Sequence, residues 1–298
     1  MTAPSTPTAG PPARYRGIRI LEVLRTETVT PQMRRLILGG EEIAGMRDDA
    51  MNIKILFAPE GVADPGWPLQ GPNGKPVWPK DPLRPIVRTY TLRWLDAVRG
   101  ELAVDFVLHA DGEATRFARR AKPGDLVGVG GPGGRKVLPA DWYLFAGDHT
   151  ALPAIAHVLE KLPADAVGHA LVEIPDAAEE QQLRKPDGIV LTWLHRDGLP
   201  PGRNTLLRDA VLALPWPAAA QRPFAWVCGE SSTVRALRAY AREERKLDRR
   251  QIHAIGYWRA GLNENAYHDA YDNDRDEDYF KTWREELAER GIPAEAAD

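Results

Sequence analysis

The chain has 298 residues, of which 43% are hydrophobic and 27% charged, a composition typical of a folded protein with room for two domains. Its net charge of −3 argues against a nucleic-acid-binding protein, which would carry an excess of basic residues. Its longest apolar runs fall well short of the ~20 residues of a membrane-spanning helix, so we expect no membrane segment. The single cysteine excludes an internal disulfide and fits a reducing cytoplasm.

The N-terminal half predicts a small β-barrel. Residues 1–15 are rich in Pro, Thr and Ala and lack the apolar core of a signal peptide, so we expect a disordered lead-in. Residues 16–139 contain short β-branched runs separated by turn residues, which is typical of an antiparallel barrel. The six predicted strands cover residues 18–23, 33–38, 51–57, 87–94, 102–109 and 125–129. A Pro-, Gly- and Trp-rich loop without clear periodicity lies between Pro59 and Pro85.

The character of the sequence changes after residue 140. Up to residue 262 strand-like and helix-like runs alternate, which predicts a parallel sheet covered by helices, an α/β domain of the nucleotide-binding type. Predicted strands cover residues 142–146, 167–174, 189–194, 224–228 and 252–258, and predicted helices cover residues 150–162, 204–214 and 233–246.

Residues 263–298 form an acidic extension with a predicted final helix near residues 278–289. The aspartates at positions 272, 274, 276 and 278 imitate the start of a calcium loop. However, Glu277 and Trp283 stand where such a loop needs Gly and Glu, so we exclude calcium.

The segment R-T-Y-T-L-R, from Arg88 to Arg93, predicts a strand that carries functional side chains. Strand alternation places Arg88 and Tyr90 on one face and Thr91 and Arg93 on the other. An aromatic ring beside guanidinium groups suits a planar anionic cofactor, because the ring can stack while Arg binds phosphate.

Glycine-rich turns supply further candidates. Residues 112–118 combine small residues with the hydroxyl of Thr115 at a predicted helix start, which suits phosphate binding. The turn at residues 147–153 lies between a strand and a helix, where Asp148 and Thr150 are candidate N-caps. Residues 128–133 match G-x-G-x-x-G, but no helix follows, so we interpret them as the exit from the last barrel strand.

Neither cysteine nor metal chemistry is indicated. Cys228 follows apolar residues and has no base nearby in the sequence, so we predict a buried structural thiol rather than a nucleophile. The seven histidines show no paired spacing suited to a resident metal.

In their order along the chain, these segments resemble the siderophore-interacting protein family, a branch of the ferredoxin-reductase-like flavoproteins. The resemblance spans residues 16–262 and rests on R-x-Y-T-x-R from Arg88, D-F-V-x-H from Asp105, G-D-H-T-A-L-P from Gly147 and G-Y-W-R-A-G from Gly256. Residues 112–118 read G-E-A-T-R-F-A, where the family usually has G-P-A-S-x-W-A. His149 replaces the usual Glu, which removes a negative charge near the cofactor.

The resemblance implies a non-covalent FAD in the barrel, with Tyr90 against the flavin ring and Arg88, Arg93 and Thr115 toward the ribose and phosphates. Trp258, at the end of a strand, would flank the ring. The implied cofactor-binding residues are Arg88, Tyr90, Thr91, Arg93, Asp105, Val107, His109, Gly112, Ala114, Thr115, Asp148, Thr150, Ala151 and Trp258. The cations implied near the open face of the flavin, as contacts for an anionic substrate, are Lys54, Arg135 and Arg259.

The resemblance also implies a function: an FAD-dependent reductase of ferric siderophores, with NADPH, NADH or ferredoxin as the electron donor. The iron then belongs to the substrate, and we expect a cytoplasmic monomer. Two alternatives stay open. One is a flavin reductase component that serves another redox partner, and the other is a siderophore-binding protein without catalysis.

Overall fold

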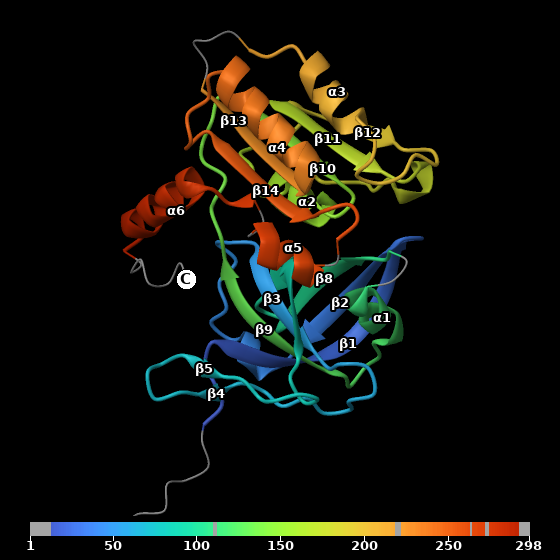
Figure 1. The fold of residues 1–298 in the computed structure, drawn as a ribbon, viewed down its shortest axis with the longest axis vertical. Helices are drawn as coiled ribbons and strands as arrows, with labels where there is room; N and C mark the ends of the chain where they lie inside the picture. Colours follow the sequence, from blue (N-terminus) through green and yellow to red (C-terminus); the bar gives the residue numbers. More distant parts are fainter. Residues whose placement is uncertain (1–12, 110–111, 218–221, 263, 272–273, 292–298) are drawn as a thin grey trace, which may run out of the picture.

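The computed structural model describes residues 13–109, 112–217, 222–262, 264–271 and 274–291. A seven-stranded antiparallel sheet curls into a barrel-like unit, and a five-stranded parallel sheet lies above it along the long axis of the molecule (Figure 1). Within these residues, none of the helices combines the length and apolar character needed to span a bilayer. The lead-in expected over residues 1–15 falls mostly outside the described ranges.

The N-terminal sheet contains all the predicted barrel strands and one more. Its order is β6-β3-β9-β1-β2-β8-β7. The strands are β1 (Ile18–Thr30), β2 (Met33–Gly39), β3 (Asn52–Phe57), β6 (Ile86–Thr91), β7 (Trp94–Asp96), β8 (Glu101–Val107) and β9 (Leu126–Gly133). The expectation of six strands is wrong because the run over residues 87–94 is divided. Its first part pairs with β3, whereas Trp94 pairs with Ala103 of β8.

Two further features of the barrel follow from its loops. The Pro-rich excursion contains a short hairpin, β4 (Leu69–Gln70) with β5 (Pro76–Val77), which its lack of periodicity did not predict. Helix α1 (Glu113–Arg120) adds Phe117 to the barrel core, where its ring stacks 4.7 Å from that of Phe57. The G-x-G-x-x-G segment lies within β9, which pairs with β1 and β3, so it is a barrel strand as predicted.

The parallel sheet has the order β12-β11-β10-β13-β14. Its strands are β10 (Trp142–Asp148), β11 (Gly168–Ile174), β12 (Ile189–His195), β13 (Pro223–Glu230) and β14 (Ile252–Trp258). The helices are α2 (Leu152–Leu159), α3 (Leu206–Ala213) and α4 (Ser231–Ala239), the last continued by a π-helical turn over Tyr240–Glu244. Alternate residues of β10 face two different cores: Tyr143 and Phe145 pack with α2, whereas Trp142 and Leu144 pack with α3 and α4.

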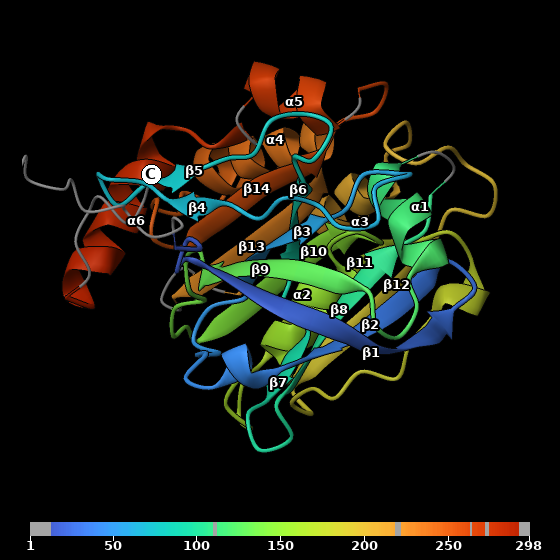
Figure 2. The same ribbon diagram turned by 90° about the horizontal axis from the view of Figure 1, so that it is seen from below.

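The acidic extension folds onto the parallel sheet. It contains α5 (Glu264–Tyr271), which was not predicted, and α6 (Glu277–Glu289), which was. The carboxylate of Asp276 caps α6 by accepting a hydrogen bond of 2.9 Å from the backbone N–H of Tyr279. Helix α6 lies on the opposite side of the molecule from α1 in both ribbon views (Figures 1 and 2). The acidic run that resembles a calcium loop therefore supplies a helix cap.

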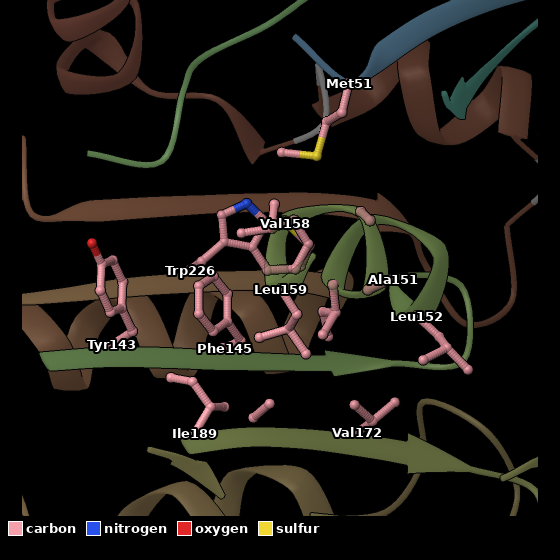
Figure 3. Close-up of a cluster of buried hydrophobic side chains, with 14 of the residues drawn as sticks. Met51, Tyr143, Phe145, Ala151, Leu152, Val158, Leu159, Val172, Ile189 and Trp226 are labelled. Carbon is pink, nitrogen blue, oxygen red and sulfur yellow. The ribbon is translucent and has the colours of Figure 1, made fainter. Parts of the chain in front are cut away.

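Barrel and parallel sheet share one apolar core. Met33 and Met51 of the barrel belong to the same cluster as α2 and the α2-facing side of the sheet. Figure 3 shows the Met51 side chain directed toward α2, next to Val158. Glu179, which is buried, also joins the two units, because it accepts hydrogen bonds from the hydroxyl of Thr30 and, at 2.8 Å, from the backbone N–H of Gln32.

A buried ion-pair network lies beside this core. Both terminal nitrogens of Arg93, which follows β6, donate to the carboxylate of Glu160 after α2, at 3.0 and 2.7 Å. Its Nε lies 3.8 Å from Asp105 of β8, and Asp105 in turn makes two hydrogen bonds, of 2.6 and 2.8 Å, with Arg35. Arg93 is only 8% exposed and Asp105 only 3%, so the barrel supplies two buried charges, and the more exposed Glu160 links them to the parallel-sheet unit.

Replacement of Arg93 by Ala should lower the free energy of unfolding by about 1.5–3 kcal/mol, because the two charge-assisted hydrogen bonds to Glu160 are lost and buried Asp105 loses a nearby positive charge. Chemical denaturation measures this change. Arg99→Ala is the control, since Arg99 is exposed and pairs with Asp96 only at 3.7 Å; its effect should stay within about 0.5 kcal/mol. Equal stability of the two variants would contradict the role given to the network.

The same junction should respond to acid through His157 of α2. Burial lowers the pKa of His157 to about 4, and its Nδ1 lies 3.3 Å from the carbonyl oxygen of Arg93. The unfolded chain therefore binds a proton more readily than the folded one. The contribution of neutral His157 to stability is therefore fully present above pH 6.5, the ordinary pKa of histidine. It is lost as the pH falls from there toward about 4. Unfolding measured across this range should show a smaller loss of stability in His157→Gln than in the parent, and identical pH profiles would refute the assignment.

Candidate functional site

Arg88 and Tyr90 lie on the edge strand β6 and face β8 and α1. The ring of Tyr90 packs at 4.2 Å from that of Phe106. The guanidinium of Arg88 donates to Glu113, the first residue of α1, at 2.7 Å and to the carbonyl oxygen of Val87 at 2.9 Å. Strand alternation thus places the cation of Arg88 at the start of α1 and the ring of Tyr90 on the same face, against Phe106 of β8.

The start of α1 fits a phosphate group. Gly112 is the N-cap residue and makes no side-chain cap, so the first N–H groups of the helix are not satisfied by a capping side chain. A Cβ on Gly112 would lie 2.4 Å from the ring of His109, so a larger residue would collide there. Ala114 and Thr115 are buried beneath, and the Thr115 hydroxyl lies 3.4 Å from the backbone N–H of His109. These residues, with Arg88 and Tyr90, would hold the diphosphate and the ring of a bound FAD.

Other predicted cofactor contacts are used inside the protein. The side chains of Thr91, Arg93 and Asp105 are buried, and those of Arg93 and Asp105 are engaged in the ion-pair network between the two units. Val107 packs against the shared apolar core. In this structure the charge of Arg93 is paired at the junction, and its contact with the ribose or phosphates stays a prediction.

At the carboxyl edge of the parallel sheet, the side chain of Asp148 joins three strands. Its Oδ1 accepts the backbone N–H of Thr150 at 2.9 Å. Its Oδ2 accepts the backbone N–H of Glu230 from β13 and the indole Nε1–H of Trp258 from β14, both at 2.8 Å. Burial raises the pKa of Asp148, whereas the hydrogen bonds from Thr150 and Trp258 act in the opposite direction. Asp148 thereby fixes the Trp258 ring, and Ala151 begins α2 beside it.

The sequence did not single out Glu230, which is the second carboxylate at this edge. Glu230 caps α4 by accepting the backbone N–H groups of Ser232 at 2.7 Å and Thr233 at 3.1 Å. A small cavity next to it is also lined by Glu173 and Asn204. The signal that could have found Glu230 is its place between a strand and a helix in C-G-E-S-S. Neighbouring Cys228 is fully buried, and burial raises the pKa of its thiol.

His149 points to the junction with the barrel. Its Nε2 lies 3.2 Å from Glu179, the carboxylate that also binds Thr30 and Gln32, and burial lowers the pKa of His149 to about 4. The replacement of the usual Glu therefore places a neutral ring, instead of a second carboxylate, beside Glu179.

The three cations predicted as substrate contacts lie in different environments. Lys54 is exposed and donates to the hydroxyl of Thr89 at 2.6 Å, so it is on the opposite face of the β3–β6 pair from Tyr90. Arg135 is only 3% exposed and pairs with Glu286 of α6 at 3.0 Å. Its guanidinium is thus buried and paired in this structure, and its role as a substrate contact stays a prediction.

Arg259 differs from these two because it follows Trp258 directly and is partly exposed. Its guanidinium lies 5.0 Å from the ring centroid of Tyr271 in α5 and donates to the hydroxyl of Ser231 at 3.2 Å. Of the three cations, Arg259 alone lies next to the Asp148–Trp258 hydrogen bond.

An antiparallel barrel followed by a parallel sheet of this order is the architecture of the ferredoxin-reductase-like proteins. Residues 22–136 match the siderophore-interacting FAD-binding domain, and residues 140–261 match the siderophore-interacting protein domain. The chain belongs to the siderophore-interacting protein family.

Three relatives illustrate the similarity. Over 256 residues the chain is 36% identical to the ferric vibriobactin reductase ViuB of Vibrio cholerae, covering 84% of this chain and 93% of the relative. It is 34% identical to the NADPH-dependent ferric-chelate reductase of Escherichia coli, covering 81% and 93%. The crystal structure of the siderophore-interacting protein SipS from Aeromonas hydrophila superposes with a TM-score of 0.75 at 34% identity, covering 89% of this chain and 99% of SipS.

Proposed function

We propose that the protein is an FAD-dependent reductase that reduces the Fe(III) of ferric siderophores to Fe(II) and so releases the iron. The observation that carries the proposal is the start of α1, where Gly112 leaves the helix without a side-chain cap and Arg88 and Tyr90 lie alongside. The names of two relatives, a ferric vibriobactin reductase and an NADPH-dependent ferric-chelate reductase, support this substrate and NAD(P)H as the donor.

A bound FAD would supply the conversion of a two-electron hydride donor into single electrons; in the overall balance one NAD(P)H would reduce two Fe(III) to Fe(II), with NAD(P)+ and one proton as the other products. Hard oxygen ligands hold Fe(II) less tightly than Fe(III), and the reduced iron therefore leaves the chelate. In this scheme the side chains and amides of the protein bind the cofactor and orient it. The amides of α1 and Arg88 would hold the diphosphate, Tyr90 would stack on the flavin, and Asp148 would keep Trp258 in place.

The proposal includes the setting of the reaction. A reducing cytoplasm suits the single free cysteine, Cys228, which is buried. We also propose that the protein works as a monomer and that ferredoxin is the alternative donor.

An anaerobic assay tests the whole proposal. The purified protein is mixed with FAD, NADH or NADPH, and a ferric siderophore, while a chelator traps Fe(II). We expect Fe(II) to form only when protein, FAD and donor are all present. Reduction of FAD without formation of Fe(II) would instead favour a flavin reductase that serves another redox partner. Failure to bind FAD would favour a siderophore-binding protein without catalysis.

Replacement of Arg88 or Tyr90 by Ala should weaken FAD binding. Loss of the Arg88 guanidinium removes a charge-assisted contact worth about 1.5–3 kcal/mol, which is roughly a 10- to 100-fold loss of affinity. Titration of the apoprotein with FAD, followed by flavin fluorescence, measures it. Glu113→Ala is the matched control, since it breaks the same ion pair but keeps the guanidinium, and it should bind FAD at least as tightly as the parent. Unchanged affinity in the Arg88 and Tyr90 variants would exclude this pocket.

A second variant tests substrate docking at Arg259. Charge reversal, Arg259→Glu, should slow the reduction of an anionic ferric chelate much more than that of a neutral hydroxamate chelate, at unchanged FAD content. The difference should shrink as salt is added, because screening weakens attraction between exposed charges. Arg250→Glu is the control, since Arg250 precedes the same strand at its opposite end. Equal slowing of both chelates would refute docking at Arg259.

A further inference from the structure

The switch point of the parallel sheet lies between β10 and β13, because the chain runs outward from β10 toward β12 on one side and continues with β13 and β14 on the other. In α/β proteins that bind dinucleotides, the diphosphate sits at such a point, on backbone N–H groups of the turns that follow the strands. Binding of a diphosphate here would therefore require that these N–H groups have no partner within the chain.

Two of the turn amides are satisfied by Asp148. Thr150 N–H, in the turn after β10, donates to its Oδ1 at 2.9 Å. Glu230 N–H, at the end of β13, donates to its Oδ2 at 2.8 Å. The Oδ1 atom thus accepts a backbone N–H from the β10 side of the switch point, and the Oδ2 atom accepts one from the β13 side.

Three more amides are satisfied by Glu230. Its Oε2 accepts the N–H groups of Ser232 at 2.7 Å and Thr233 at 3.1 Å, both in the first turn of α4. Its Oε1 accepts the N–H of Ala260, after β14, at 3.2 Å. The helix start that would offer a phosphate its amides is therefore occupied by a carboxylate of the chain itself.

Charge and space act in the same direction. Asp148, Glu173 and Glu230 are 6%, 6% and 4% exposed, and all three line one small cavity. A diphosphate brought to these buried carboxylates would be repelled. The loop that contains Gly202 packs closely against both side chains. A Cβ on Gly202, whose φ is +67°, would lie 2.6 Å from Cγ of Glu230 and 2.9 Å from the ring of Trp258.

We propose that Asp148 and Glu230 are specificity-determining residues for the electron donor: they take the place of the donor's diphosphate, so that binding relies on the dihydronicotinamide riboside half. This inference rests on the proposed function, in which a nicotinamide nucleotide reduces the flavin. It assigns the carboxyl edge of the sheet to recognition of an uncharged ring and ribose, with the adenosine and phosphate groups left outside.

The direct test is a calorimetric titration of the full chain with ADP-ribose, which carries the diphosphate and adenosine but no nicotinamide. We expect no binding up to about millimolar concentration. In anaerobic flavin reduction, NADPH and 1,4-dihydronicotinamide riboside should have saturation constants within about tenfold of each other. Micromolar binding of ADP-ribose, or a saturation constant for NADPH more than about 100-fold below that of the riboside, would overturn the proposal.

Variants add a test of the residues themselves. Glu230→Gln removes one buried charge with little change in shape, so the NADPH constant should fall relative to the riboside constant and ADP-ribose should bind measurably. Glu244→Gln is the matched control, since Glu244 is exposed at the far end of the π-helical turn that continues α4. In this variant the ratio of the NADPH constant to the riboside constant should equal that of the parent. A ratio for Glu230→Gln equal to that of Glu244→Gln would argue against the proposal.

These results can be told apart from failure of the proposed function. The ADP-ribose titration needs neither flavin nor iron, so it tests the carboxylates even if the protein reduces no chelate. Conversely, a parent protein that binds FAD but is reduced by neither NADPH nor the riboside would refute the nicotinamide donor, whatever the titration shows.

Discussion

The arrangement of this molecule depends on buried charge pairing around Arg93. Its guanidinium lies between Glu160 after α2 and Asp105 of the barrel, and Asp105 is held by Arg35. Because Arg93 is buried, removal of Glu160 would leave its guanidinium without the partner that it hydrogen-bonds, so separation of the two units is costly. Because α2 begins just after β10, the pairing at its far end also fixes Asp148 and the carboxyl edge of the sheet relative to the barrel.

Two helix starts in this framework are treated in opposite ways. At α1, Gly112 supplies no side chain to satisfy the first amides, and Arg88 adds positive charge nearby. At α4, Glu230 satisfies the amides from within the chain. Both helices offer the same kind of donors, since any helix leaves its first N–H groups unpaired. The two helices therefore differ in how their first amides are satisfied: no side chain caps α1, where we propose that the cofactor diphosphate binds, whereas a carboxylate of the chain caps α4.

The buried carboxylates at the sheet edge also have a structural role. Asp148 gathers donors from the ends of three strands, and one of these is the indole of Trp258. Since a buried carboxylate needs such donors to offset its desolvation, the hydrogen bonds hold the strand ends and the aromatic ring in one arrangement. Asp148, which we propose excludes the diphosphate of the donor, thus also positions the Trp258 ring, which would flank the flavin.

The sequence by itself determined the longer strands, the change to β–α alternation and the face shared by Arg88 and Tyr90, because these depend on local periodicity and on the alternation of side chains along a strand. It also determined that the G-x-G-x-x-G segment belongs to the end of the last barrel strand and is not a dinucleotide fingerprint, since no helix follows. It missed the short strands β4, β5 and β7, which are two or three residues long. Only the tertiary structure decided which partners the other charged side chains have. Arg93 pairs with a residue 67 positions away and Arg135 with one 151 positions away, so no local pattern could distinguish them from ligand-binding arginines. The same holds for Glu230. Its carboxylate can take the place of a phosphate only because parallel pairing brings the ends of β10, β13 and β14 together.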